Sequence, residues 1–350
     1  MQTHGRLGIA FPLALFASLT LAAEDRGPGF VLQGEGGLVT TIALDPSSSS
    51  TLYAATARGL YKTMDAGASW RQIGRDLENH TLLAVAVDPA SPPSLFVATD
   101  SGGVLRSRDG GEHWVEAGGV LAGRHVGTVA ADPKGRGGVY AGADGGRLFH
   151  SGDGAARWEE RTTPARVAIS AIAVDPEGDR VVIGTNSEGV FWSDDGGASW
   201  QRPSGTLSRG TVWSLAFDRA SGAFFAGTHD GLFRSDDRGA TWISSSRGLR
   251  SLNVLALAVD PSAAGALYAG TAAAIYASKD GGRSWIEIAP DLFVTALAID
   301  PRCPSILYAA THLGVIKSED GGAKWKPLRL ASGRNPADAS GYPRISASTR

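Results

Sequence analysis

Residues 278–285 read Ser-Lys-Asp-Gly-Gly-Arg-Ser-Trp, and the same pattern of Ser or Thr, Asp, Gly and Trp at fixed spacing occurs seven times in the 350-residue chain. Successive copies lie 40 to 44 residues apart, and only the third departs from the pattern, with Ala155 at the glycine position. A repeat of this period is typical of a solenoid or a propeller. The motif aspartates are Asp65, Asp109, Asp153, Asp195, Asp237, Asp280 and Asp320, and the motif tryptophans are Trp70, Trp114, Trp158, Trp200, Trp242, Trp285 and Trp325.

Each motif is preceded by short apolar stretches that have the pattern of β-strands. The first ends at Asp-Pro in six copies and at Asp218-Arg219 in the fifth, and an alanine between bulky residues stands two positions before each aspartate. This period-two alternation predicts a strand. A second and a third apolar stretch follow, as at residues 52–56 and 59–63, and the motif tryptophan opens a fourth.

Four short antiparallel strands in each repeat are the signature of a propeller blade. We therefore predict an all-β fold, a seven-bladed β-propeller of four-stranded blades, over residues 24–330. The repeats are expected near residues 38–72, 81–116, 125–160, 168–202, 211–244, 252–287 and 294–330.

Both ends of the chain differ from the repeats. In residues 1–23, His4 and Arg6 precede an apolar stretch that ends in small residues, which predicts a cleaved signal peptide. An uncleaved membrane anchor is the alternative. We expect export to a periplasm or the cell exterior. Residues 331–350 are rich in Ser, Ala, Gly and Pro, so a disordered tail is expected. Residues 30–34 resemble a fourth strand, which we expect to join the seventh blade and lock the ring.

Composition and charge exclude several classes of function. The 33 Lys and Arg are balanced by 35 Asp and Glu, which argues against a nucleic-acid binder. Cys303 is the only cysteine, so neither a disulfide framework nor a multi-cysteine zinc site can form. The motif turns lack the further oxygen ligands of a calcium loop. We therefore expect no metal and no cofactor.

The connections between blades carry the best candidates for a ligand site. Five of the six contain arginine, and guanidinium groups on one rim would attract carboxylates, phosphates or an acidic peptide. Ordinary solvated surface charge is the alternative. Trp213 is unique at its repeat position, which favours either a ligand contact or core packing. The predicted partner-binding residues are Arg75, Arg124, Arg166, Arg209, Arg250 and Trp213.

Asp100 and Asp144 occupy similar places in the turns between the second and third strands of successive repeats. Two carboxylates facing each other across a channel could perform general acid–base chemistry on a glycoside. The alternative is that both are solvated turn residues.

The repeated motif resembles the Asp-box, or BNR repeat, over residues 38–330. This resemblance implies that the motif aspartates close tight turns and that the motif tryptophans anchor the blades, away from the ligand face. Sialidases share the Asp-box, but every tyrosine of the chain lies at a repeat position except Tyr342 in the tail, so none is left over as their nucleophile, and the Phe-Arg-Ile-Pro signature is absent. In xyloglucanase-type endoglucanases a similar Thr-Asp-x-Gly-Gly turn carries a catalytic aspartate. Residues 99–103 resemble it, although they lie in the second repeat.

The chain also resembles the photosystem II stability and assembly factors and their relatives in non-photosynthetic bacteria. Its length, export signal, blade count and arginine-bearing connections agree with that family. This resemblance implies a non-catalytic, monomeric scaffold that binds a protein partner, such as a membrane-protein segment or an envelope complex, through a basic face. A glycoside hydrolase or a glycan-binding propeller is the alternative.

Overall fold

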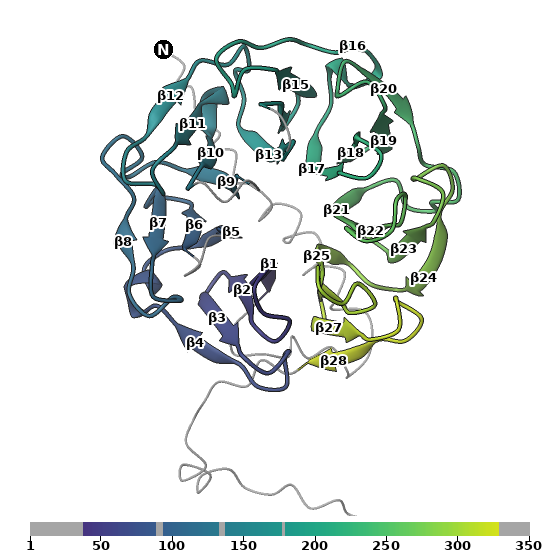
Figure 1. Ribbon diagram of the computed structural model, residues 1–350, viewed down its shortest axis with the longest axis horizontal. Helices are drawn as coiled ribbons and strands as arrows, with labels where there is room; N and C mark the ends of the chain where they lie inside the picture. Colours follow the sequence, from purple (N-terminus) through teal and green to yellow (C-terminus); the bar gives the residue numbers. More distant parts are fainter. Residues whose placement is uncertain (1–37, 89–93, 133–136, 177–178, 329–350) are drawn as a thin grey trace, which may run out of the picture.

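The computed structural model describes residues 38–88, 94–132, 137–176 and 179–328, and these form a closed ring of seven β-sheets (Figure 1). The predicted all-β, seven-bladed propeller is therefore confirmed. Within each blade the chain starts with a strand near the centre of the ring and moves outward, pairing each strand with the next in antiparallel fashion. The predicted signal peptide (1–23), the predicted locking strand (30–34) and the predicted tail (331–350) lie outside the described residues.

The strands are short, and the helical segments are single 3-10 turns. The first four blades contain β1 (Val39–Leu44), β2 (Leu52–Thr56), β3 (Gly59–Thr63), β4 (Arg71–Ile73), β5 (Leu82–Val87), β6 (Leu95–Thr99), β7 (Val104–Ser107), β8 (Val115–Glu116), β9 (Val126–Ala131), β10 (Val139–Ala143), β11 (Leu148–Ser151), β12 (Glu159–Arg161), β13 (Ile169–Val174), β14 (Val181–Thr185) and β15 (Val190–Ser193). The last three contain β16 (Ser204–Gly205), β17 (Val212–Asp218), β18 (Ala223–Thr228), β19 (Gly231–Ser235), β20 (Thr241–Ser244), β21 (Val254–Val259), β22 (Leu267–Thr271), β23 (Ala274–Ser278), β24 (Ile286–Pro290), β25 (Val294–Ile299), β26 (Leu307–Thr311), β27 (Gly314–Ser318) and β28 (Lys326–Leu328). The 3-10 turns are η1 (Arg75–Leu77), η2 (Asp144–Gly146) and η3 (Thr206–Ser208).

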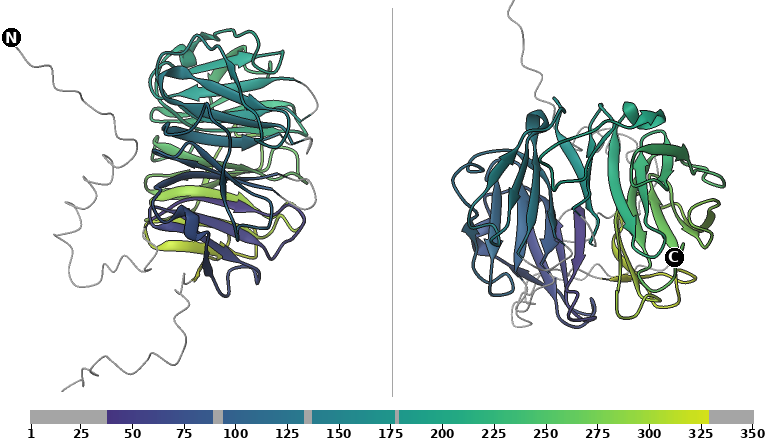
Figure 2. Two further views of the ribbon diagram at one scale, coloured as in Figure 1. Left: turned by 90° about the vertical axis from the view of Figure 1, so that its left-hand side faces the viewer. Right: turned by 45° about the horizontal axis from the view of Figure 1, so that its top comes forward.

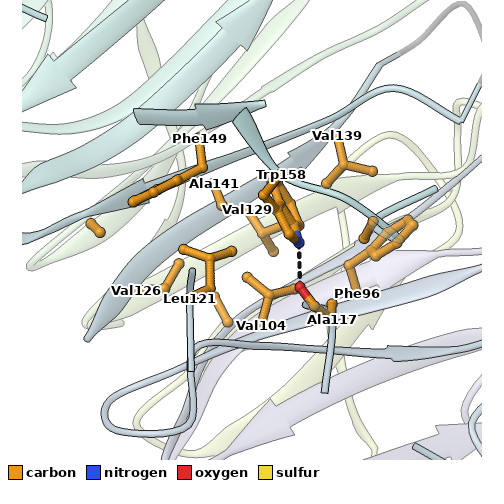
Figure 3. Packing of buried hydrophobic residues seen from close by; sticks show 13 residues of the cluster. Phe96, Val104, Ala117, Leu121, Val126, Val129, Val139, Ala141, Phe149 and Trp158 are labelled. Atoms are coloured by element: carbon orange, nitrogen blue, oxygen red, sulfur yellow. Dashed lines mark hydrogen bonds between the residues drawn. The ribbon is translucent and has the colours of Figure 1, made fainter. Parts of the chain in front are cut away.

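The apolar core lies between the blades. The second strands are almost entirely buried, as in β2 and β6, because each is covered on both faces by neighbouring blades, and only Tyr268 in β22 is partly exposed. Trp158 shows how a motif tryptophan fills this space: its indole N–H donates to the carbonyl of Ala117 in the preceding blade and packs near Phe96 and Val129 (Figure 3). Each blade is thus stabilised by its neighbours.

The fourth blade departs from the four-strand pattern. Its outer strand is reduced to a single bridge between Trp192 and Gln201. In the second and fifth blades, the third residue after the motif tryptophan donates its N–H to the third strand, as Ala117 does to Val104 O and Ser245 does to Leu232 O, both at 2.8 Å. Pro203 occupies that position here and has no N–H. The chain instead crosses to the fifth blade, where β16 pairs in parallel with β20.

Candidate functional site

The turns of the propeller fall on two faces, seen from the side in Figure 2. The first face carries the motif turns and the turns between first and second strands, which bond each other, as Ala66 N donates to Ser50 O at 2.9 Å. The second face carries the turns between second and third strands together with the inter-blade connections. There Gly189 N donates to Gly210 O at 3.0 Å. The motif turns and the arginine-bearing connections therefore lie at opposite ends of the strands.

The motif aspartates are occupied by bonds within their own turns. Asp65 Oδ1 accepts from Thr63 Oγ1 at 2.7 Å and from the N–H of Ser69 at 2.8 Å, and its other oxygen accepts from Ser69 Oγ at 2.5 Å. Bonds from Ser69 lower the pKa of Asp65 to about 2. The carboxylate therefore closes a hairpin turn and has few acceptor positions left for a ligand. Within the described ranges, no group of three or more His, Cys, Asp or Glu is arranged to hold a metal ion.

The backbone of the motif turns also links neighbouring blades. Lys62 Nζ donates to the carbonyl of Gly110 at 3.0 Å, and Arg106 Nη1 donates to the equivalent carbonyl of Gly154 at 2.6 Å. Tyr268 makes the same link through its hydroxyl, which donates to Gly321 O at 3.2 Å. Lys62 and Arg106, on the third strands of the first two blades, therefore join neighbouring blades.

The inter-blade connections are held down by buried side chains close to their arginines. Leu77 is fully buried, Leu121 and Leu207 are almost so, and Ala165 takes the same place in the third connection. Leu121, Ala165 and Leu207 each lie against the glycine that precedes the third strand of their own blade, as Leu121 O does at Gly103, whereas Leu77 lies near Gly74 within its connection. We call these the plug residues. A connection tied down in this way holds its flanking arginines at a fixed place on the second face.

Four of the five predicted arginines flank the turns of the second face, and we call them the arginine rim (Arg124, Arg166, Arg209 and Arg250). Arg166, Arg209 and Arg250 are exposed. Glu188 accepts a hydrogen bond of 2.9 Å from the backbone N–H of Arg166, but in the described part of the chain no carboxylate pairs with the guanidinium group of Arg166 or Arg209, and that of Arg250 lies 3.9 Å from Glu287. Arg124 is half-buried, and its Nε donates to Val120 O at 2.6 Å. The rim thus offers three exposed guanidinium groups.

Arg75 lies apart from the rim. It is exposed on the outer wall of the ring, in a groove of about 510 Å³ that also contains Glu112 and His113 from the motif turn of the second blade. This position follows from η1, where Asp76 accepts from the N–H of Trp114 at 3.2 Å and ties the connection to the next blade. From the sequence, Arg75 was predicted to lie with the other four arginines, because the sequence shows only that all five lie in connections between blades.

Trp213 occupies a β-bulge near the start of β17, where the pairing register with β18 shifts between Val212 and Ser214. The equivalent Thr40 and Ser170 donate to backbone carbonyls of the next blade. Trp213 is half-buried and its indole nitrogen is buried. Trp213 is thus partly accessible to solvent, at a position where the equivalent residues contact the next blade.

The candidate acids stand in adjacent blades and are not in contact. Asp100 is exposed and accepts from Ser101 Oγ at 3.0 Å. Asp144 is exposed, and its carboxylate lies 3.2 Å from His125 Nδ1. Within the described residues, no hydrogen bond or ion pair joins Asp100 to Asp144. Each carboxylate thus has its own local partner.

No protein-family model and no curated protein sequence matches the chain. Several solved structures share its fold. The GH74 enzyme of Niastella koreensis has a TM-score of 0.73 at 17% identity, and the GH74 xyloglucanase of Xanthomonas campestris has 0.70 at 22%. These comparisons cover 84% and 85% of this chain, which spans about half (54%) the length of each enzyme. YCF48 bound to a D1 peptide has a TM-score of 0.63 at 17% identity, covering 84% of this chain and 97% of YCF48. The chain is thus similar in fold both to GH74 enzymes and to YCF48.

Proposed function

We propose that this chain is an exported, non-catalytic interaction scaffold that binds a protein partner through the arginine rim. The observation that carries the proposal is the exposure of the Arg166, Arg209 and Arg250 guanidinium groups on the second face, where the one ion pair among the described residues is the 3.9 Å contact of Arg250 with Glu287. Exposed guanidinium groups bind carboxylates through paired hydrogen bonds. The expected partner segment therefore carries acidic side chains or a terminal carboxylate.

Two further points support a protein partner. YCF48, a propeller of similar extent, is described in complex with a peptide, whereas this chain spans only about half of each GH74 enzyme. The sequence also resembles the assembly-factor family in its Asp-box motif, its export signal and its arginines. We propose that the seven turns are Asp-boxes that hold the ring and that the partner is a membrane-protein segment or an envelope complex.

The test is partner capture from envelope extract with residues 24–350 as bait. The rim variant carries Arg166→Glu, Arg209→Glu and Arg250→Glu. A matched control carries Arg108→Glu, Arg157→Glu and Lys324→Glu, which reverse three exposed charges in motif turns of the first face. Partners retained by the control and lost by the rim variant support the proposal, and a shared partner list would overturn it.

A glycoside hydrolase remains the second candidate, because the fold is similar to that of GH74 enzymes and Asp100 and Asp144 are exposed on the second face. A screen for reducing-sugar release from soluble polysaccharides tests it. Hydrolysis that is lost in both Asp100→Asn and Asp144→Asn would establish the enzyme, whereas hydrolysis unaffected by either change would exclude these acids.

A further inference from the structure

A second groove lies on the outer wall at the junction of the fifth and sixth blades. It has a volume of about 280 Å³. Its floor is the end of β20 and the connection that follows, and its far side is Arg283 in the motif turn of the sixth blade. It is lined by charged residues, with Ile243 and Ser244 beside them, and the charged residues are Arg234, Asp236, Arg247 and Arg283.

The groove has an excess of positive charge. Its one carboxylate, Asp236, is already bound by Arg234, whose Nε donates to it at 2.7 Å. Arg234 is itself 8% exposed and donates through Nη1 to Gly281 O at 2.5 Å. Arg247 and Arg283 are exposed, and within the described residues no carboxylate side chain pairs with either. Arg283 Nη1 donates to Asp280 O at 2.8 Å, which leaves the other N–H groups of Arg283 and the guanidinium of Arg247 for an anionic ligand.

The floor of the groove is also an open strand edge. Ser245 N donates inward to Leu232 O at 2.8 Å, and Trp242 O accepts from Thr206 Oγ1 on the outer side at 2.9 Å. Because backbone groups alternate along a strand, the N–H and C=O of Ser244 point outward, toward the groove. The polar backbone of β20 is thus exposed where the basic side chains converge.

The chain itself shows that this edge accepts another strand. β16 lies along the first half of β20, with Ser204 opposite Thr241 and Gly205 opposite Trp242 in parallel orientation. η3 then turns the chain away, so the edge from Ile243 onward stays uncovered. Ile243 is 60% exposed there and offers an apolar contact.

The groove at the junction of the first and second blades provides a comparison, since it is built from the same repeat positions. Arg75 and Arg247 each lie five residues after a motif tryptophan, and Glu112 and Arg283 each lie three residues after a motif aspartate. In the first groove, Glu112 forms an ion pair with Arg71, and Asp76 and Glu78 add further negative charge. The two grooves share their architecture and differ in the sign of their charge.

We infer that the second groove binds an extended acidic segment of a partner protein, which adds as a strand to the outer edge of β20. Its backbone bonds Ser244, and its carboxylates pair with Arg247 and Arg283. Addition of a strand to an open sheet edge is a common mode of peptide recognition. This site lies on the outer wall and does not depend on the arginine rim.

Fluorescein-labelled peptides test the inference on residues 24–350. The probe is the hexapeptide Thr-Glu-Val-Glu-Val-Glu, acetylated and amidated, and its control has Lys in place of each Glu. We expect fluorescence anisotropy to show binding of the acidic peptide only. Hydrogen exchange should show protection of residues 241–247. Protection confined to other segments, or no binding of the acidic peptide, would overturn the inference.

Three variants separate the contributions. The Arg247→Ala and Arg283→Ala double variant should weaken binding at least about tenfold, because charge-assisted bonds are lost. Arg71→Ala with Arg75→Ala, at the matched groove, should leave the affinity unchanged. Ser244→Pro removes the outward N–H and keeps the bonds to β19, so it should also weaken binding about tenfold with little change in folding.

The rim variant distinguishes this inference from the proposed function. Arg166→Glu with Arg209→Glu and Arg250→Glu should bind the acidic hexapeptide as well as the natural chain does. Equal affinity in the Arg247→Ala and Arg283→Ala variant, or loss of binding in the rim variant alone, would place the peptide elsewhere and contradict the inference.

Discussion

The hydroxyl of Thr295, at the bulge of β25, donates a hydrogen bond of 2.8 Å to the carbonyl oxygen of Val39 in β1, and so joins the seventh blade to the first across 256 residues of sequence. The same bond links the first blade to the second, from Thr40 to Leu82 O at 3.2 Å. The fourth and fifth blades are joined in this way by Ser170, which donates to Val212 O at 2.6 Å. Ring closure therefore uses a contact that also joins blades that are consecutive in the chain.

The Thr295→Val variant should destabilise the propeller by about 1 kcal/mol, because the hydroxyl donor to Val39 O is lost while the shape of the side chain is kept. Urea unfolding, followed by tryptophan fluorescence, measures this. Thr295→Ser keeps the donor and should stay within about 0.5 kcal/mol of the natural chain. A loss in Thr295→Ser with none in Thr295→Val would show that the methyl group, and not the hydrogen bond, stabilises the junction.

The link from Lys62 to the Gly110 carbonyl predicts a second effect on stability. Lys62→Met should cost about 1–2 kcal/mol, because a charge-assisted bond and the placement of Nζ 5.6 Å from the centre of the Tyr53 ring are both lost. Lys62→Arg should restore most of the loss, since Arg106 makes the same bond one blade later. The melting temperatures of the natural chain, Lys62→Met and Lys62→Arg measure both effects. An unchanged melting temperature in Lys62→Met would mean that the bond contributes nothing.

The repeated motif was enough to predict the class of fold, the number of blades and the order of the strands. The spacing from Asp to Trp predicts the position of each turn. The alanine-containing apolar stretches upstream predict the inner strands. Pro203 is visible in the sequence, and its missing N–H is the reason that the outer strand of the fourth blade stops. This effect could not be predicted, because the sequence does not show which N–H groups pair with the third strand in the other blades. The parallel pairing of β16 with β20 could not be predicted, because a two-residue strand has no periodicity.

The candidate sites were harder to predict, because exposure and pairing depend on neighbouring blades. Arg283 replaces the alanine that most copies carry at its position, so the departure was visible in the sequence, yet nothing there showed that Arg247 lies in the same groove. In the same way, Glu112 is three residues from its motif aspartate but neutralises Arg71 in the preceding blade. Contacts across blade junctions decide which charges are free.

Substitution of a plug residue should lower the free energy of unfolding more than substitution of an exposed residue in the same connections. Leu207→Ala should cost about 2–5 kcal/mol, because Leu207 is 3% exposed and packs with Trp192 and Val212 between the fourth and fifth blades. Leu252→Ala, in the next connection, should cost under about 0.5 kcal/mol, since Leu252 is 48% exposed. Urea unfolding of both variants measures the difference. Equal losses would show that burial of the plug does not hold the connection.

Trp213 offers a test that separates packing from partner binding. Trp213→Leu restores the residue found at the equivalent positions Leu83 and Leu255, so the apolar contact between blades is largely kept. We expect a loss of about 1 kcal/mol or less in the free energy of unfolding. If Trp213 contacts a partner, the same variant should lose captured proteins that the natural chain retains. An unchanged partner list would restrict Trp213 to packing.

The motif aspartates predict a loss of stability in acid. Hydrogen bonds within the turns lower the pKa of all seven. For Asp65 and Asp280, bonds led by Ser69 and Ser284 lower the pKa from 3.8 to about 2.

Because the folded-state pKa lies below that of the unfolded chain, the stabilisation is complete above about pH 4 and is lost as the pH falls toward 2. Urea midpoints between pH 6 and pH 2 measure this effect. The Asp65→Asn variant should start from a lower midpoint at pH 6 and lose less on acidification, because one titrating carboxylate is gone. A midpoint that stays constant down to pH 2 would contradict the role of these hydrogen bonds in holding the turns.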